Sequence, residues 1–201
     1  MKSPISSQLW FEPGINGLPY ELPIHPNLVH FTIGLFIIAI VFDLAGTFFP
    51  LDRPILKTFG FTALRSGFYH VGWYNLLASA IITFFTVAMG FFELVLANPP
   101  TSEKSAWGLA VGTTMVLHGL GGIFLLAAIV AMTVWRGLQR YHWRSNKVRQ
   151  VQWLYLLAGI AIMLIMYIQG TLGAQLGDEF GIHTTAADLL RQGKNPNVVL
   201  K

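Results

Sequence analysis

The chain has 201 residues, the length of one domain, and it is 54% hydrophobic but only 11% charged. A soluble domain carries roughly 25% charged residues, so this composition predicts an integral membrane protein. The absence of cysteine excludes disulfides, iron–sulfur clusters and covalently attached haem. The formal net charge of +4 does not indicate nucleic-acid binding, because topology accounts for the basic residues.

The first predicted element is an N-terminal arm over residues 1–27. It is rich in proline and glycine, which predicts an extended, turn-rich segment on the membrane surface. Trp10, Phe11 and Tyr20 suit such an interfacial position. No apolar run typical of a signal peptide precedes Pro23. We therefore expect the first membrane helix to be an uncleaved targeting element.

Four apolar runs predict four transmembrane helices. A bilayer core of ~30 Å needs about 20 residues of helix at a rise of ~1.5 Å per residue. The runs cover residues 28–49, 71–97, 106–135 and 151–172. We expect an all-α membrane protein with a four-helix bundle over residues 28–172. A polar segment and tail over residues 173–201 follow, with a short amphipathic helix at 186–192.

The connection between the second and third runs contains two prolines, Pro99 and Pro100. These residues stop a helix, and Thr101 or Ser102 is expected to cap the next one. Gly108 and Gly112 then form a GxxxG pair, a pattern that favours close packing of membrane helices.

Basic residues predict the orientation. Eight of the thirteen lysines and arginines lie at the connections between helices one and two and between helices three and four: Arg53, Lys57, Arg65, Arg136, Arg140, Arg144, Lys147 and Arg149. The positive-inside rule places these two connections in the cytoplasm. Both termini are therefore expected on the outer side, periplasmic or lumenal, of a bacterial plasma or thylakoid membrane.

Four polar residues are expected to share one outer layer of the bundle: His25, His30, Glu93 and His118. His118 is ~18 Å along a helix from Ala106, deeper than His30. The third run, however, spans ~45 Å as a helix and is too long for a core of ~30 Å. If its first two turns protrude, His118 reaches the level of His30.

Such a layer has three interpretations. Two imidazoles facing each other across a bundle can occupy both axial positions of a b-type haem iron, with His30 and His118 as ligands and His25 and Glu93 beside them. Two imidazoles and a carboxylate can instead hold zinc or non-haem iron. The histidines can also be structural, each hydrogen-bonded to a carbonyl group.

Asp43 lies within the first apolar run and is costly there if it is unpaired. Arg65, His70 and Arg136 are the candidate partners, because all three are expected near the same face of the membrane. An ion pair between the first and third helices is the simpler interpretation. A proton relay through Asp43 and His70 is the alternative.

The opening of the first helix, Ile24-His25-Pro26-Asn27-Leu28-Val29-His30-Phe31, resembles a membrane-protein family catalogued as domain of unknown function 2231, which opens with His-Pro-x-x-Val-His-Phe. Weaker similarities follow in Gly90–Glu93, in His118 with Arg136, and in Gly170–Leu176. Thr32 replaces the family's proline and Glu93 its aspartate. The resemblance implies a four-helix membrane domain and groups His25, His30, Glu93 and His118 as one set.

Three functions remain open from the sequence. The first is a haem-binding or electron-transfer subunit of a respiratory or photosynthetic membrane, whose partners are other membrane redox subunits or a second copy of the chain. The second is a structural or assembly subunit of a larger membrane complex. The third is a conductor of protons or small solutes. The chain carries no nucleophile, phosphate-loop or metalloprotease motif, so no independent catalytic activity is expected.

Overall fold

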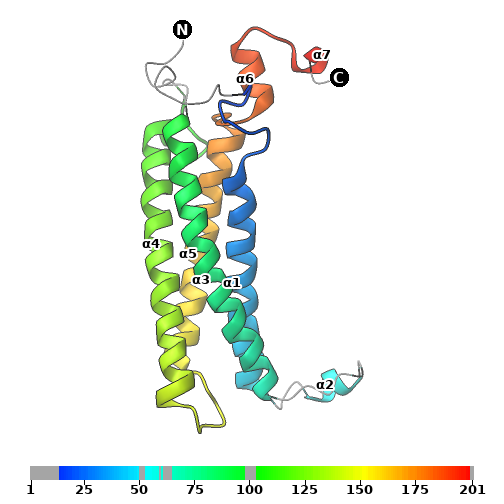
Figure 1. The fold of residues 1–201 in the computed structure, drawn as a ribbon, viewed down its shortest axis with the longest axis vertical. Helices are drawn as coiled ribbons and strands as arrows, with labels where there is room; N and C mark the ends of the chain where they lie inside the picture. Colours follow the sequence, from blue (N-terminus) through cyan, green and yellow to red (C-terminus); the bar gives the residue numbers. More distant parts are fainter. Residues whose placement is uncertain (1–13, 50–52, 59, 61–64, 98–102, 200–201) are drawn as a thin grey trace. The chain divides into compact units, whose positions relative to one another are not determined.

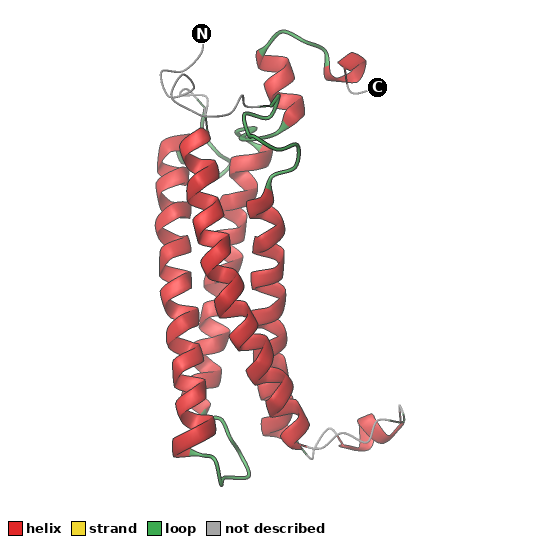
Figure 2. Cartoon of the chain, viewed as in Figure 1, coloured by secondary structure: helices red, strands yellow, loops and turns green. Residues whose placement is uncertain are grey.

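A computed structural model describes residues 14–49, 53–58, 60, 65–97 and 103–199. Long helices dominate this part of the chain, and it contains no strand (Figure 2). Figure 1 shows the helices in chain order: α1 (Ile24–Phe48), α2 (Arg53–Thr58), α3 (Arg65–Leu96), α4 (Val111–Leu138), η1 (Gln139–Trp143), α5 (Trp153–Asp178), α6 (Thr185–Arg191) and α7 (Pro196–Val199).

Four of these segments are long and apolar enough to cross a membrane: α1, α3, α4 continued by η1, and α5. This confirms the predicted fold class, an all-helical protein with four spanning helices. Large apolar side chains are exposed along the four helices, for example Phe31 at 63%, Phe84 at 62% and Leu164 at 65%. A bilayer accommodates such side chains, whereas water does not.

The helix ends differ from the apolar runs. Helix α3 begins at Arg65, six residues before the run at 71, and α5 continues to Asp178 instead of ending at 172. A helix continues beyond the apolar core as long as its backbone groups stay paired, so polar residues extend it at the membrane surface. The predicted C-terminal helix corresponds to α6.

The third helix begins later than predicted. Residues 106–110 are a turn, in which Gly108 adopts φ 75°, and Lys104 and Ala110 form an isolated bridge. Gly108 therefore precedes α4, and the GxxxG pair does not form a helical packing face. The arm before Gly14 and the proposed caps Thr101 and Ser102 lie outside the described residues.

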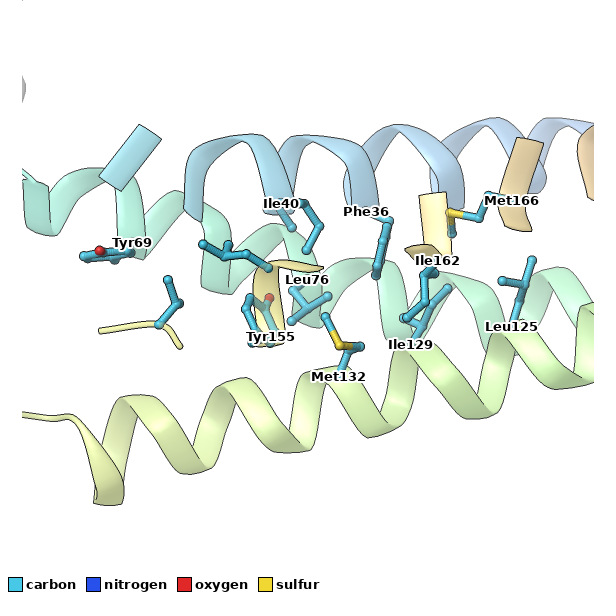
Figure 3. Packing of buried hydrophobic residues seen from close by; sticks show 13 residues of the cluster. Phe36, Ile40, Tyr69, Leu76, Leu125, Ile129, Met132, Tyr155, Ile162 and Met166 are labelled. Carbon is cyan, nitrogen blue, oxygen red and sulfur yellow. The ribbon is translucent and has the colours of Figure 1, made fainter. Parts of the chain in front are cut away.

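The chain divides into two compact units. Unit 1 consists of Met1–Asn27, Ala88–Gly121 and Gln169–Lys201, and unit 2 consists of Leu28–Val87 and Gly122–Ile168. Unit 2 contains the larger apolar core, to which α1, α3, α4 and α5 all contribute (Figure 3). Phe36, Leu76, Ile129 and Tyr155 lie in this core with no exposed surface. Unit 1 has a smaller core around Val111, Leu176 and Phe180.

Candidate functional site: a histidine pair and a buried ion pair

A carboxylate in unit 1 holds the start of α1. Oε1 of Glu93, on α3, accepts hydrogen bonds from the backbone amides of Ile24 at 2.8 Å and His25 at 3.0 Å. These amides belong to the first turn of α1, where no acidic residue of the helix itself is present. Glu93 is only 5% exposed and replaces the missing cap, because a carboxylate suits the positive end of a helix. It therefore fixes the backbone of His25.

Tyr20 completes this arrangement. Its hydroxyl donates to the same oxygen of Glu93 at 2.9 Å. The pKa of Tyr20 is raised, first by burial and then by the hydrogen bond and the negative charge of Glu93. A raised pKa means that this hydrogen bond stabilises the fold below pH ~10 and is lost only as the pH rises further. The hydroxyl therefore remains a donor at physiological pH.

Two imidazole rings meet in unit 1. His25 of α1 and His118 of α4 have ring centroids 5.9 Å apart and ring planes at 86°. Each ring lies over a glycine. A Cβ added at Gly90 would lie 2.7 Å from Cε1 of His25, and one at Gly173 would lie 2.8 Å from Cε1 of His118. These two glycines on α3 and α5 therefore provide the space that the rings occupy.

Gln169 of α5 orients His118. Nδ1 of His118 lies 3.2 Å from the backbone oxygen of Gln169, and the side-chain amide of Gln169 donates to the backbone oxygen of His118. The side-chain nitrogen of Gln169 also lies 3.1 Å from Nδ1, so Nδ1 either donates to the carbonyl or accepts from this amide. In the tautomer in which Nδ1 donates to the carbonyl, Nε2 carries the lone pair. A hydrogen bond from the second ring nitrogen to a backbone carbonyl is typical of histidines that bind metals.

His30, which the sequence pairs with His118, belongs to unit 2, and its side chain is exposed. His25 supplies the ring beside His118 instead. Two residues five positions apart on a helix point about 140° apart, so His25 and His30 cannot share one face.

Sequence reasoning missed His183, which follows α5. Its Nδ1 lies 3.0 Å from the backbone oxygen of Asn16, and its Nε2 lies 2.8 Å from the backbone oxygen of Glu93. The residue adopts φ 56°, a left-handed conformation uncommon outside glycine. The ring thereby links the N-terminal segment to the end of α3. No spacing in the sequence indicates this link, because it depends on the turn at Gly181.

Unit 2 contains the second polar cluster, a buried ion pair. Nε of Arg136, on α4, lies 2.9 Å from Oδ2 of Asp43, on α1, and Nη2 lies 3.0 Å from Oδ1. Both side chains are 0% exposed. Nη2 also donates to the backbone oxygen of Tyr69 at 3.3 Å. Arg136 was one of three partners that the sequence left open for Asp43, and the two-point geometry is the strong form of such a pair.

The other two candidate partners of Asp43 have different contacts in unit 2. Nη2 of Arg140 donates to Nδ1 of His70 at 2.7 Å, and the guanidinium of Arg65 lies 5.7 Å from the ring centre of Phe49. Among the described residues, neither His70 nor Arg65 forms an ion pair with Asp43. The relay through Asp43 and His70 stays a prediction.

The fold defines an integral membrane protein with four spanning helices, a histidine pair in one unit and an ion pair in the other. The chain belongs to the family described as predicted membrane protein, domain of unknown function 2231, whose model matches residues 21–186. The match covers all four spanning helices and both polar clusters. Searches of curated proteins and of solved structures found no match.

The cap on α1 gives a first prediction. Glu93→Ala leaves two helix-terminal amides and the Tyr20 hydroxyl without their acceptor, so we expect a loss of about 0.5–2 kcal/mol of stability. Glu93→Gln keeps an acceptor oxygen and is expected to lose less. Thermal unfolding in detergent measures the change, and amide exchange at residues 24 and 25 locates it. Glu21→Ala, at an exposed position of the same unit, is the control, and equal losses in both variants would refute the cap.

Proposed function

We propose that this protein is a haem-binding membrane subunit that exchanges electrons with other membrane redox proteins, and that His25 and His118 are its axial ligands. The observation that carries the proposal is the imidazole pair in unit 1, with ring centroids 5.9 Å apart. Paired histidines on facing helices of a bundle can take both axial positions of one iron. When bound, haem supplies one-electron chemistry.

The separation of the rings suits one metal ion between them. With a metal–nitrogen bond of ~2.0 Å and about 1 Å from nitrogen to ring centre, imidazoles on opposite sides of an ion have centroids ~6 Å apart. Perpendicular planes, as at 86°, are compatible with this arrangement because each ring can turn about its own metal–nitrogen bond. The distance between the rings therefore supports His25 and His118 as the residues that would hold one metal ion.

The donor set favours haem over zinc or non-haem iron. A protein-bound zinc or non-haem iron needs three or more protein ligands in most sites. Among the residues that the structure describes, no group of three histidine, aspartate or glutamate side chains gathers for a metal ion. Two histidines suffice when a porphyrin contributes the remaining four nitrogens.

The remaining residues of unit 1 position these ligands. Gln169 holds the His118 ring at Nδ1, and Glu93 fixes the backbone of His25. Neighbouring apolar side chains of α4 are exposed, with Val116 at 58% and Leu120 at 61%. Lipid that covers these side chains would exclude water from the histidine pair. Solvent exposure is one of the factors that set the reduction potential of a haem.

A spectrum tests the proposal. The full chain, produced with haem available and purified in detergent, is expected to show Soret and α bands that sharpen on reduction. His118→Ala and His25→Ala are each expected to lower the haem content at least tenfold, because the loss of a metal ligand, or of a residue that orients one, reduces metal affinity by such a factor. His30→Ala is the matched control, because this histidine is on the same helix as His25 but in the other unit.

Three results would overturn the proposal. A wild-type protein without bound haem leaves the structural or assembly role as the better explanation. Loss of the bands in His30→Ala but not in His25→Ala would move the ligand to the other histidine. A protein that contains zinc by elemental analysis, with no haem spectrum, would replace the electron-transfer role by a structural metal.

A further inference from the structure

A cluster of positive charge lies in η1 and in the connection from η1 to α5, within unit 2. We call it the basic turn and define it by Arg140, Arg144, Lys147 and Arg149. No aspartate or glutamate occurs from residue 104 to residue 177. The basic turn therefore has no acidic neighbour in its own part of the sequence.

Hydrogen bonds hold the backbone of the basic turn in place. Nε of Arg144 donates to the backbone oxygen of Arg149 at 2.9 Å, and the amide of Arg144 donates to the backbone oxygen of Gln139 at 2.8 Å. The side-chain oxygen of Gln139, a residue that is 0% exposed, accepts from the amide of Gln152 at 2.7 Å. The charges are therefore presented by an ordered loop that closes on a buried side chain.

Aromatic residues flank the charges. The guanidinium of Arg140 lies 5.5 Å from the ring centre of Tyr141, and that of Arg149 lies 5.1 Å from the ring centre of Trp153. Tyr141 is 58% exposed, Trp143 55% and Trp153 47%. Tyrosine and tryptophan next to arginine at the end of a spanning helix are typical of the headgroup level of a bilayer.

Two side-chain donors of Arg140 have no acceptor in the part of the chain that the structure describes. Its Nη2 binds His70, but its Nε and Nη1 are buried and have no acceptor among the described residues. Nε2 of Gln139, one residue earlier, is in the same condition. Buried donors on a charged group are costly when they lack an acceptor, and a phosphate oxygen is the acceptor that arginine binds most readily.

We propose that the basic turn binds the phosphodiester headgroup of an anionic phospholipid in the adjacent leaflet. Four cations with no aspartate or glutamate near them in the sequence provide the charge complementarity, the exposed aromatic rings place the loop at headgroup depth, and Nε and Nη1 of Arg140 provide donors for a phosphate oxygen. Clusters of four or more basic residues beside a spanning helix have this lipid preference. The site is independent of the histidine pair and of the haem proposal.

Lipid titration of the full chain in a neutral detergent tests the site, with bound lipid counted by native mass spectrometry. We expect phosphatidylglycerol to bind at least tenfold more tightly than phosphatidylcholine and binding to weaken with salt. Each neutralised cation is expected to lower the affinity about fivefold. Arg140→Gln with Arg149→Gln should therefore lower it about 25-fold. The double variant Lys147→Gln with Arg149→Gln leaves the contact between Arg140 and His70 unchanged. It replaces the first variant if that one does not fold.

The matched control removes the same charge elsewhere. Lys104→Gln with Lys194→Gln changes two exposed lysines of unit 1 and is expected to leave phosphatidylglycerol binding unchanged. Equal binding of the two lipids, or an equal loss in the control, would overturn the proposal. Competition by millimolar inorganic phosphate would also overturn it, since free phosphate and not a lipid headgroup would then be the ligand.

Discussion

Replacing Arg136 with methionine is expected to destabilise the protein by about 3–5 kcal/mol, because Asp43 then remains buried and charged without a partner. Both side chains of the pair are 0% exposed, and two hydrogen bonds connect them. The backbone oxygen of Tyr69 also loses a donor. Thermal or denaturant unfolding in detergent measures this loss, which should far exceed that of an exposed substitution.

The double variant separates the charge from the packing. Asp43→Leu together with Arg136→Met removes both charges and fills similar volume, and replacement of this kind is often neutral or stabilising. We expect it to recover most of the stability that Arg136→Met loses. Asp188→Asn breaks the exposed pair with Arg191 and is the control, with an expected change below about 1 kcal/mol. If the double variant is no more stable than the single, the ion pair is not the cause of the loss.

The length of the apolar runs predicted the four spanning helices, because a helix needs about 20 apolar residues to cross a bilayer. The residues at which each helix begins and ends were predicted less well. Apolar residues at 106–110 predict that the third helix begins there, but Gly108 turns the chain with φ 75°. The partly polar residues 65–70 predict no part of a spanning helix, although α3 begins at Arg65. Hydrophobicity reports the surrounding solvent, whereas backbone conformation sets where a helix begins.

The polar clusters show what one sequence leaves undetermined. A charge within lipid requires a partner, which reduced the choices for Asp43 to three. The rotation of each helix about its axis decides among them, and single-sequence patterns do not encode it. The same rotation decides that His25, and not His30, contacts His118. The glycines beneath the rings, Gly90 and Gly173, gave no distinct signal, because small residues in membrane helices also serve ordinary close packing.

Replacing Gly173 with alanine is expected to destabilise the protein by about 1–3 kcal/mol, the usual cost of an added methylene in a filled site. The new Cβ would lie 2.8 Å from Cε1 of His118 and 3.5 Å from both of its ring nitrogens. The ring cannot move away freely, because Gln169 holds it at Nδ1. The better helix propensity of alanine recovers at most about 1 kcal/mol, so the net change remains a loss.

Gly170 is the matched control for this substitution. It lies on the same helix, three residues earlier, and a Cβ there would meet nothing within 4 Å. Gly170→Ala is therefore expected to stabilise the protein by up to about 1 kcal/mol through helix propensity. Unfolding midpoints that move in opposite directions for the two variants would show that Gly173 makes room for His118. If both variants gain stability, the His118 imidazole does not require a glycine at position 173. The contact between Gly173 and His118 would then no longer support an ordered histidine pair.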